Sequence, residues 1–228
     1  MRVKFRYSLD ELKGRLLVMA SLAEQSIQRS IEGYCGRDMA MCDLVVHSEM
    51  AINRLQREID QKALDLLATE QPMAIDLRFI MAVLRINVDL ERVGDQAVNI
   101  TERAREMMSL PETDLPVDIP RLASLAGAMV RRALQAFIEG DAALAQSVLM
   151  LDDQVDDLNR EASRSLIALI SQRPELTTQA LSALIVAKNL ERIGDHATNI
   201  AEDVIFWVMG ADVRHGAPMV AELETSAV

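Results

Sequence analysis

The chain repeats one stretch of eleven residues almost unchanged, and this repeat limits the folds that are open to it. LERVGDQAVNI occupies residues 90–100, and LERIGDHATNI occupies residues 190–200, at an offset of 100. A second pair, INRLQRE (52–58) and VDDLNRE (155–161), recurs at an offset of 103. Two similar units in tandem account for both offsets if the second unit is three residues shorter between its middle and last helices.

Apolar residues recur with the period of a helix along nearly the whole chain, and no alternating strand pattern is present. The 9 glycines, 6 prolines and 3% aromatic residues also favour long helices with few loops. We expect an all-α fold of two tandem three-helix bundles, with short turns between antiparallel neighbours. The six expected helices span residues 9–32, 38–70, 71–108, 121–139, 141–171 and 174–210.

Capping residues and prolines mark the expected boundaries. Asp38 and Asp141 are expected N-caps, and Pro72 is expected in the first turn of the third helix. The proline-rich stretch LPETDLPVDIP separates the two units. We therefore divide the chain into a first repeat, a linker, a second repeat and a loosely structured tail, at residues 1–110, 111–120, 121–210 and 211–228.

The charge balance excludes several classes of ligand. The formal net charge is −11, so binding to nucleic acid or to an anionic membrane surface is disfavoured, whereas metal cations or a basic partner protein are favoured. The N-terminus has no apolar signal-peptide core, and no run of 18 apolar residues could span a membrane. Cys35 and Cys42 are expected to be ordinary reduced thiols. These features predict a cytoplasmic protein.

A helical wheel separates the repeated stretch into an apolar face and a polar face. The residues expected in the core are Ile86, Leu90, Val93, Ala97, Ile100 and Ala104, with Leu190, Ile193, Ala197, Ile200 and Val204 in the second unit. The residues expected to point outward are Glu91, Asp95, Asn99 and Glu102, with Glu191, Asp195, Asn199 and Glu202 in the second unit.

An acidic face opposite an apolar one is usually a solvated surface. Two observations favour a site instead. Residues 89–100 and 189–200 match at 8 of 12 positions, whereas the preceding eleven positions match only at Leu84 and Leu184. Carboxylates at i and i+4 also repel each other unless a cation bridges them, and Arg92 and Arg192 could offset only part of that repulsion.

The middle helices carry a second set of polar pairs at the same spacing. Glu49 and Asn53 are matched by Asp152 and Asp156, beside the apolar positions of each helix. If the middle helix lies beside the last one, each unit presents two oxygen-bearing pairs side by side. Such a donor set suits Mg²⁺, Mn²⁺, Ca²⁺ or ferric iron. Gly94 and Gly194 within the motif are better explained by close helix packing than by a ligand.

At this point the sequence resembles the PhoU-type phosphate-uptake regulators. The residues that carry the resemblance are EQPMAIDLRFI (70–80), the duplicated LERVGD and LERIGD, and GADVRHG (210–216). The resemblance implies a cytoplasmic, often dimeric adaptor between the ATPase of a phosphate transporter and a sensor histidine kinase. It further implies a role in switching off the phosphate-starvation response.

The resemblance also implies multinuclear metal clusters, with iron as the first candidate and manganese, magnesium or calcium as alternatives. The pairs carried over are Glu91 with Asp95, Glu191 with Asp195, and Asp152 with Asp156. The remaining pair, Glu49 with Asn53, departs from the family pattern because an amide replaces a carboxylate. The first-unit site is therefore expected to bind metal more weakly.

Two other functions remain open on the residues alone. The acidic faces could be docking surfaces for a protein without any metal. A carboxylate-bridged metalloenzyme in a helical bundle is disfavoured, because such sites use a Glu-x-x-His spacing that this chain lacks. The Asn99, Glu102, Asn199 and Glu202 side chains are weaker ligand candidates than the four pairs.

Overall fold

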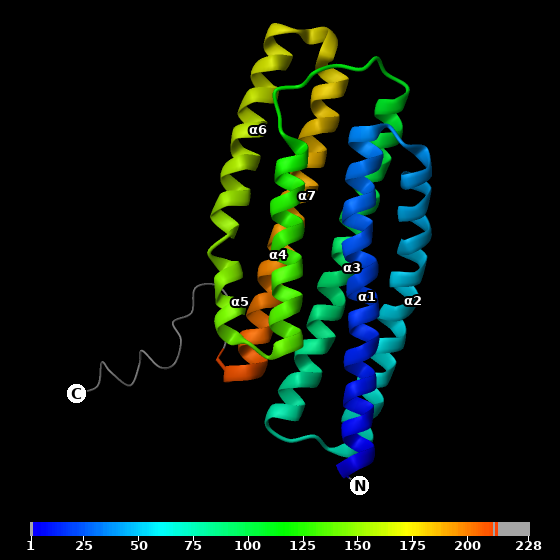
Figure 1. Ribbon diagram of the computed structural model, residues 1–228, viewed down its shortest axis with the longest axis vertical. Helices are drawn as coiled ribbons and strands as arrows, with labels where there is room; N and C mark the ends of the chain where they lie inside the picture. Colours follow the sequence, from blue (N-terminus) through cyan, green and yellow to red (C-terminus); the bar gives the residue numbers. More distant parts are fainter. Residues whose placement is uncertain (1, 212, 214–228) are drawn as a thin grey trace, which may run out of the picture.

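The computed structural model describes residues 2–211 and 213 of the chain, and every element in that part is helical. The elements are α1 (Arg2–Gly36), α2 (Met39–Glu70), α3 (Ile75–Met108), α4 (Ile119–Glu139), α5 (Ala142–Leu149), α6 (Asp152–Gln172), the short 3-10 helix η1 (Pro174–Leu176) and α7 (Thr177–Met209) (Figure 1). The predicted all-α fold is confirmed. The predicted tail and most of the closing motif 210–216 lie outside the described residues.

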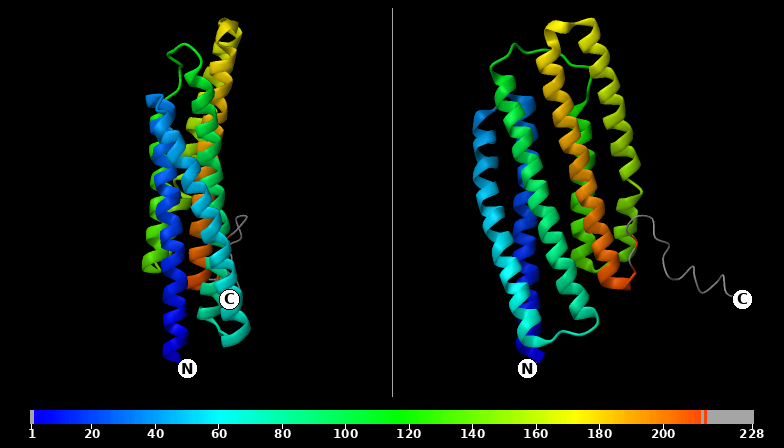
Figure 2. Two further views of the ribbon diagram at one scale, coloured as in Figure 1. Left: turned by 90° about the vertical axis from the view of Figure 1, so that its right-hand side faces the viewer. Right: turned by 180° about the vertical axis from the view of Figure 1, so that it is seen from behind.

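The helices form two antiparallel bundles that lie side by side along the long axis of the molecule. One bundle contains α1, α2 and α3, and the other contains α4, α5, α6 and α7. Seen from behind, α3 and α7 lie next to each other between α2 and α6 (Figure 2). The contact of α3 with α7 is the most extensive between any two helices, and α1 also contacts α4. The repeated LER-x-GD stretches thus lie at the centre of the molecule.

The hydrophobic core is continuous across both repeats. Leu12, Phe137, Leu90 and Leu190, from four different helices, are fully buried in one connected cluster. Each such side chain contributes roughly 1.5–3 kcal/mol to stability. All core positions predicted for the last helix of each repeat are buried: Ile86, Leu90, Val93, Ala97, Ile100, Ala104, Leu190, Ile193, Ala197, Ile200 and Val204.

Local capping explains where several helices begin and end. The Asp38 carboxylate accepts hydrogen bonds from the backbone N–H groups of Ala40 and Met41, at 2.8 and 3.3 Å. Asp141 caps α5 in the same way. At the other ends of α4 and α7, Gly140 and Gly210 have φ angles of 65° and 72°, a conformation that side chains disfavour. The two predicted N-caps are confirmed.

Three predicted boundaries are wrong. α1 begins at Arg2, well before residue 9. Pro72 lies in the connection before α3, because Gln71 and Ala74 have φ angles of 47° and 48° and interrupt the helix there.

The predicted fifth helix is also broken. It stops at Leu149 and resumes at Asp152 as α6. Asp152 and Asp153 lie in the first turn of α6, where the helix dipole favours acidic side chains. At the break, Met150 is 76% exposed.

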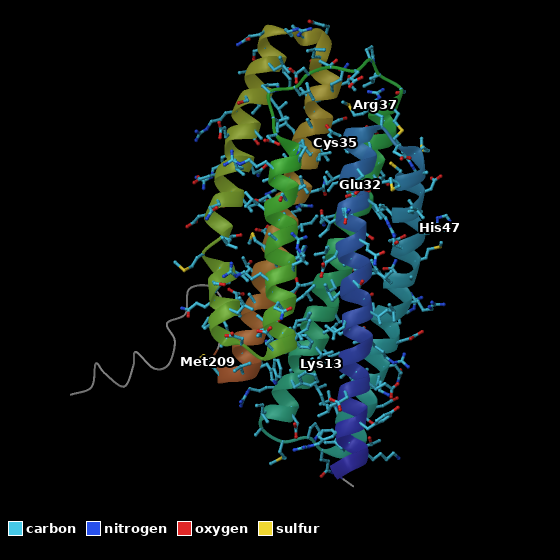
Figure 3. All side chains as sticks on the ribbon, viewed as in Figure 1. Lys13, Glu32, Cys35, Arg37, His47 and Met209 are labelled. Atoms are coloured by element: carbon cyan, nitrogen blue, oxygen red, sulfur yellow. The ribbon has the colours of Figure 1, made fainter. Side chains whose placement is uncertain are left out.

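Contacts at one end of the molecule fasten the two repeats together. Phe79 stacks on Phe137 at a centroid distance of 5.9 Å and meets Trp207 edge-on at 5.1 Å. The Nε of Arg78 donates a hydrogen bond to the Trp207 carbonyl at 3.1 Å. Lys13, on α1, donates to the carbonyl of Ile138 at 2.8 Å (Figure 3). None of the described helices is both long and apolar enough to cross a membrane.

Candidate functional site

The second repeat brings its four predicted carboxylates together between α6 and α7. We call Asp152, Asp156, Glu191 and Asp195 the second cluster. Burial raises the pKa of Asp195, and the negative charges of Glu191, Asp152 and Asp156 raise it further. Burial likewise raises the pKa of Asp152, with Asp156, Asp153 and Glu191 adding to the effect. One cation offsets this charge, since the Nζ of Lys188 lies 2.5 Å from a Glu191 oxygen.

The first repeat places its predicted side chains between α2 and α3. We call Glu49, Asn53, Glu91 and Asp95 the first cluster. The amide of Asn53 forms a hydrogen bond within the cluster, since its Nδ2 donates to Glu49 Oε1 at 2.7 Å. Arg92 forms ion pairs with both other acids, at 3.5 Å from Glu91 and 3.4 Å from Asp95. The predicted partial neutralisation by arginine therefore occurs here.

The pKa of Glu91 shows how the first cluster differs from a solvated surface. Burial raises this pKa most, and the charges of Asp95 and Glu49 add to the rise. Arg92 and His196 act in the opposite direction. Glu91 is therefore within electrostatic range of Glu49 on α2 and of His196 on α7.

The predicted outward orientation of Glu91 and Glu191 needs correction. The Glu91 and Glu191 side chains are only 19% and 13% exposed, so both are mostly buried. A solvated face would leave them open to water. Within the part of the chain that the structure describes, no three acidic, histidine or cysteine side chains converge closely enough to hold one ion. The structure thus groups the predicted carboxylates without forming a complete coordination sphere.

The two motif glycines explain why the helices of each cluster come close. A Cβ atom on Gly94 would lie 3.1 Å from Ile52 Cδ1, and Ile52 lies between Glu49 and Asn53 in α2. A Cβ atom on Gly194 would lie 3.4 Å from Val155 Cγ1 in α6. The packing explanation for these glycines is therefore supported.

Asn99 and Asn199, predicted to face outward beside the acids, form hydrogen bonds to the other repeat, and Asn199 is also exposed. Asn99 Nδ2 donates to Asn189 Oδ1 at 3.3 Å, and Asn199 Nδ2 donates to Asp89 Oδ1 at 3.1 Å. The two bonds are equivalent, since 89 corresponds to 189 and 99 to 199 in the repeat. Packing between repeats therefore explains why this asparagine is the same in both copies.

Sequence reasoning missed Asp89 and His196. The Nδ1 of His196 lies 2.8 Å from Asp89 Oδ1, and both side chains are mostly buried. One signal in the sequence could have revealed them. Asp89 and Asn189 occupy equivalent positions, at the same offset of 100 as the repeated motif. Of the two weaker candidates, Glu102 is exposed and lies 3.8 Å from Arg103, while Glu202 is half-buried.

Comparison with known proteins gives one consistent result. A family model described as the PhoU domain matches residues 16–104 and again residues 119–204. The phosphate-specific transport system accessory protein PhoU homolog of Pseudomonas putida is 36% identical over 228 residues, covering 99% of this chain and 89% of that protein. The corresponding Clostridium acetobutylicum protein is 33% identical, covering 92% of this chain and 96% of that protein.

Solved structures agree with the sequence matches. The crystal structure of PhoU from Pseudomonas aeruginosa superposes with a TM-score of 0.87 at 34% identity, covering 91% of this chain and 100% of that one. The phosphate transport system regulatory protein PhoU from Streptococcus pneumoniae superposes with a TM-score of 0.84 at 27% identity, covering 92% of this chain and 99% of that one. The duplicated motif, the paired three-helix repeats and these matches together show that the chain belongs to the PhoU family.

Proposed function

We propose that this protein is a non-enzymatic adaptor that lowers phosphate uptake and switches off the phosphate-starvation response. One observation carries the proposal: both repeats match the PhoU domain, and relatives matched over nearly their whole length are named phosphate-specific transport system accessory proteins. The Streptococcus pneumoniae relative is named a regulatory protein of phosphate transport. These are accessory and regulatory names rather than enzyme names.

The proposed partners are the ATPase subunit of the phosphate transporter and a phosphate-sensing histidine kinase, which a homodimer would contact in the cytoplasm. A chain with a net charge of −11 is suited to partners with basic docking surfaces. Pull-down of each purified partner with the full chain tests the adaptor role, and failure to bind either partner would contradict it. Light scattering coupled to size-exclusion chromatography tests the homodimer.

The second cluster is the proposed cation site. Its donors are all carboxylate oxygens, which hard cations such as iron, manganese, magnesium or calcium prefer. A bound cation would supply positive charge among acids that raise one another's pKa values. Asp152 and Asp156 would hold it from α6, and Glu191 and Asp195 from α7. The first cluster is proposed to bind more weakly because Asn53 and Arg92 already offset its charge.

Elemental analysis of protein purified without chelator tests the cation site. After reconstitution with iron or manganese, we expect stoichiometric metal in the wild type and less in Asp195→Ala. Asp95→Ala serves as the matched variant in the first repeat and is expected to retain more metal. Wild-type protein that holds no stoichiometric metal after reconstitution would remove the proposal.

A second candidate function is docking of a protein partner on the acidic clusters without metal. It is favoured by the absence, among the described residues, of three side chains that converge on one ion. It is also favoured by Arg92, which neutralises part of the first cluster. The same elemental analysis separates the two candidates, because docking predicts partner binding by a metal-free wild type.

A further inference from the structure

The connection between α2 and α3 has a strained backbone that the function proposed above does not use. Gln71 is in the left-handed region, with φ 47° and ψ 59°, and Ala74 has φ 48° and ψ −114°. Neither residue is glycine, so each conformation costs free energy. Such strain persists only where the surrounding structure holds it in place.

The base of this connection is held firmly by the second repeat. Arg78 donates from Nε to the Trp207 carbonyl, and a Cβ atom on Gly210 would lie 3.4 Å from its Cζ. The next residue, Phe79, packs against both Phe137 and Trp207. The strained turn therefore extends from a rigid base.

The turn and the start of α3 present apolar side chains to solvent. Met73 is 78% exposed, Ile75 52% and Leu77 40%, and we call these three residues the apolar tip. Glu70 and Asp76 flank the tip, and neither carboxylate forms an ion pair with a side chain that the structure describes. The tip is thus an apolar projection with free negative charge beside it.

The matching connection in the second repeat shows that the fold does not require this exposure. There the chain forms the 3-10 helix η1 without a positive φ angle, and its Leu176 is only 6% exposed. The connection in the second repeat buries its apolar residue, whereas the first repeat exposes Met73 in its connection and two further apolar residues at the start of α3. A strained, rigidly supported apolar projection is typical of a recognition element.

We propose that the apolar tip docks into a protein partner that presents an apolar pocket rimmed by lysine or arginine side chains. Met73 enters the pocket, and the carboxylates of Glu70 and Asp76 face the basic rim. The inference rests on the adaptor function proposed above and assigns the surface by which the adaptor is recognised. Its rigid base lowers the entropy lost when the tip is bound.

Binding measurements on the full chain test this surface. Biolayer interferometry with the immobilised transporter ATPase, and separately with the kinase's cytoplasmic part, compares wild type, Met73→Glu and Met150→Glu. Met150 is the matched control because it is 76% exposed, on the second repeat. We expect Met73→Glu to weaken binding of at least one partner by tenfold or more, roughly the loss at a hot-spot residue. Met150→Glu should stay within about twofold of wild type.

The outcomes separate the surface from the function. Equal binding by Met73→Glu and wild type would overturn the inference and leave the adaptor role standing. A wild type that binds neither partner would remove the adaptor role and the inference together. Glu70→Gln combined with Asp76→Asn should slow association at low salt and have little effect at high salt, because a basic rim acts mainly on the association rate. If the association rate of this double variant at low salt equals that of wild type, the proposed basic rim on the partner is wrong.

Discussion

The two acidic clusters occupy equivalent places in the two repeats but differ in how their charge is offset. In the first cluster, an amide replaces one carboxylate and donates to Glu49, and Arg92 contacts both remaining acids. In the second cluster all four side chains are carboxylates, and Lys188 pairs with Glu191 alone. Among the described residues Arg192, the counterpart of Arg92, forms no ion pair. Two copies of one motif can therefore diverge through neighbouring residues while the motif itself is unchanged.

The difference has an energetic consequence. Repulsion among like charges weakens a fold unless cations lie nearby. In the first cluster Arg92 contacts both remaining acids. In the second cluster Lys188 pairs with Glu191, and burial together with neighbouring acids raises the pKa values of Asp152 and Asp195. The dependence on an added cation should therefore be concentrated in the second repeat.

The largest expected effect is stabilisation of the wild type by a divalent cation. Mn²⁺ at about 100 times its dissociation constant should stabilise the chelator-treated protein by roughly 2.7 kcal/mol. Asp195→Asn should lose most of that gain, and Asp95→Asn should keep most of it. Thermal unfolding with and without Mn²⁺ measures this directly. Equal losses of Mn²⁺ stabilisation in the two variants would contradict the proposed difference in cation binding between the two clusters.

The motif glycines should also respond differently to alanine. Gly94→Ala places a methyl group 3.1 Å from the fully packed Ile52, and we expect a loss of roughly 1 kcal/mol from overpacking. Gly194→Ala makes an ordinary contact with Val155, so its higher helix propensity should give a gain of roughly 0.5 kcal/mol. Urea unfolding of both variants provides the measurement. A gain at both positions would show that Ile52 can shift to accept the added methyl group, and would remove this difference between the repeats.

Asn53→Asp gives the first cluster four carboxylates, the same number as in the second cluster. It removes the hydrogen bond to Glu49 and adds a fourth acid, so we expect a loss of about 1 kcal/mol at pH 7 without metal. The reverse change, Asp156→Asn, should give a small gain. Urea unfolding under identical conditions compares them, and a loss of similar size in both would contradict the role assigned to charge.

The smallest expected effect is a pH-dependent gain in Asp195→Asn. Because the pKa of Asp195 is raised in the folded state, this carboxyl favours folding below its ordinary pKa of 3.8 and loses that contribution as pH rises through the raised value. The variant should therefore exceed metal-free wild type by roughly 0.5 kcal/mol at pH 7. The difference should shrink as pH falls toward 3.8. A constant difference across this range would exclude ionisation as its cause.

Features set by local sequence could be predicted well. Helical periodicity and the capping carboxylates of Asp38 and Asp141 depend on residues within one turn, and the structure contains the corresponding helices. The break at Met150 and the positive φ angles at Gln71 and Ala74 were missed. Helical periodicity alone does not mark these interruptions.

The candidate site likewise contains features that local sequence predicted and features that it did not. The i, i+4 spacing correctly grouped Glu91 with Asp95 and Glu191 with Asp195, because one helix determines that geometry. It could not reveal that Asn99 pairs with Asn189, which lies 90 residues away. That partner is set by how α3 and α7 cross. Spacing alone therefore could not identify the hydrogen-bond partners of the asparagines in the other repeat.

The equivalent hydrogen bonds of Asn99 and Asn199 make the contact between α3 and α7 symmetric. Each repeat donates one hydrogen bond from an asparagine and accepts one from the asparagine of the other repeat. The contact is therefore isologous, as in a C2 homodimer. The covalent connection between the repeats adds nothing to that exchange. In its interior, this single chain therefore has the arrangement of a homodimer of two half-length units.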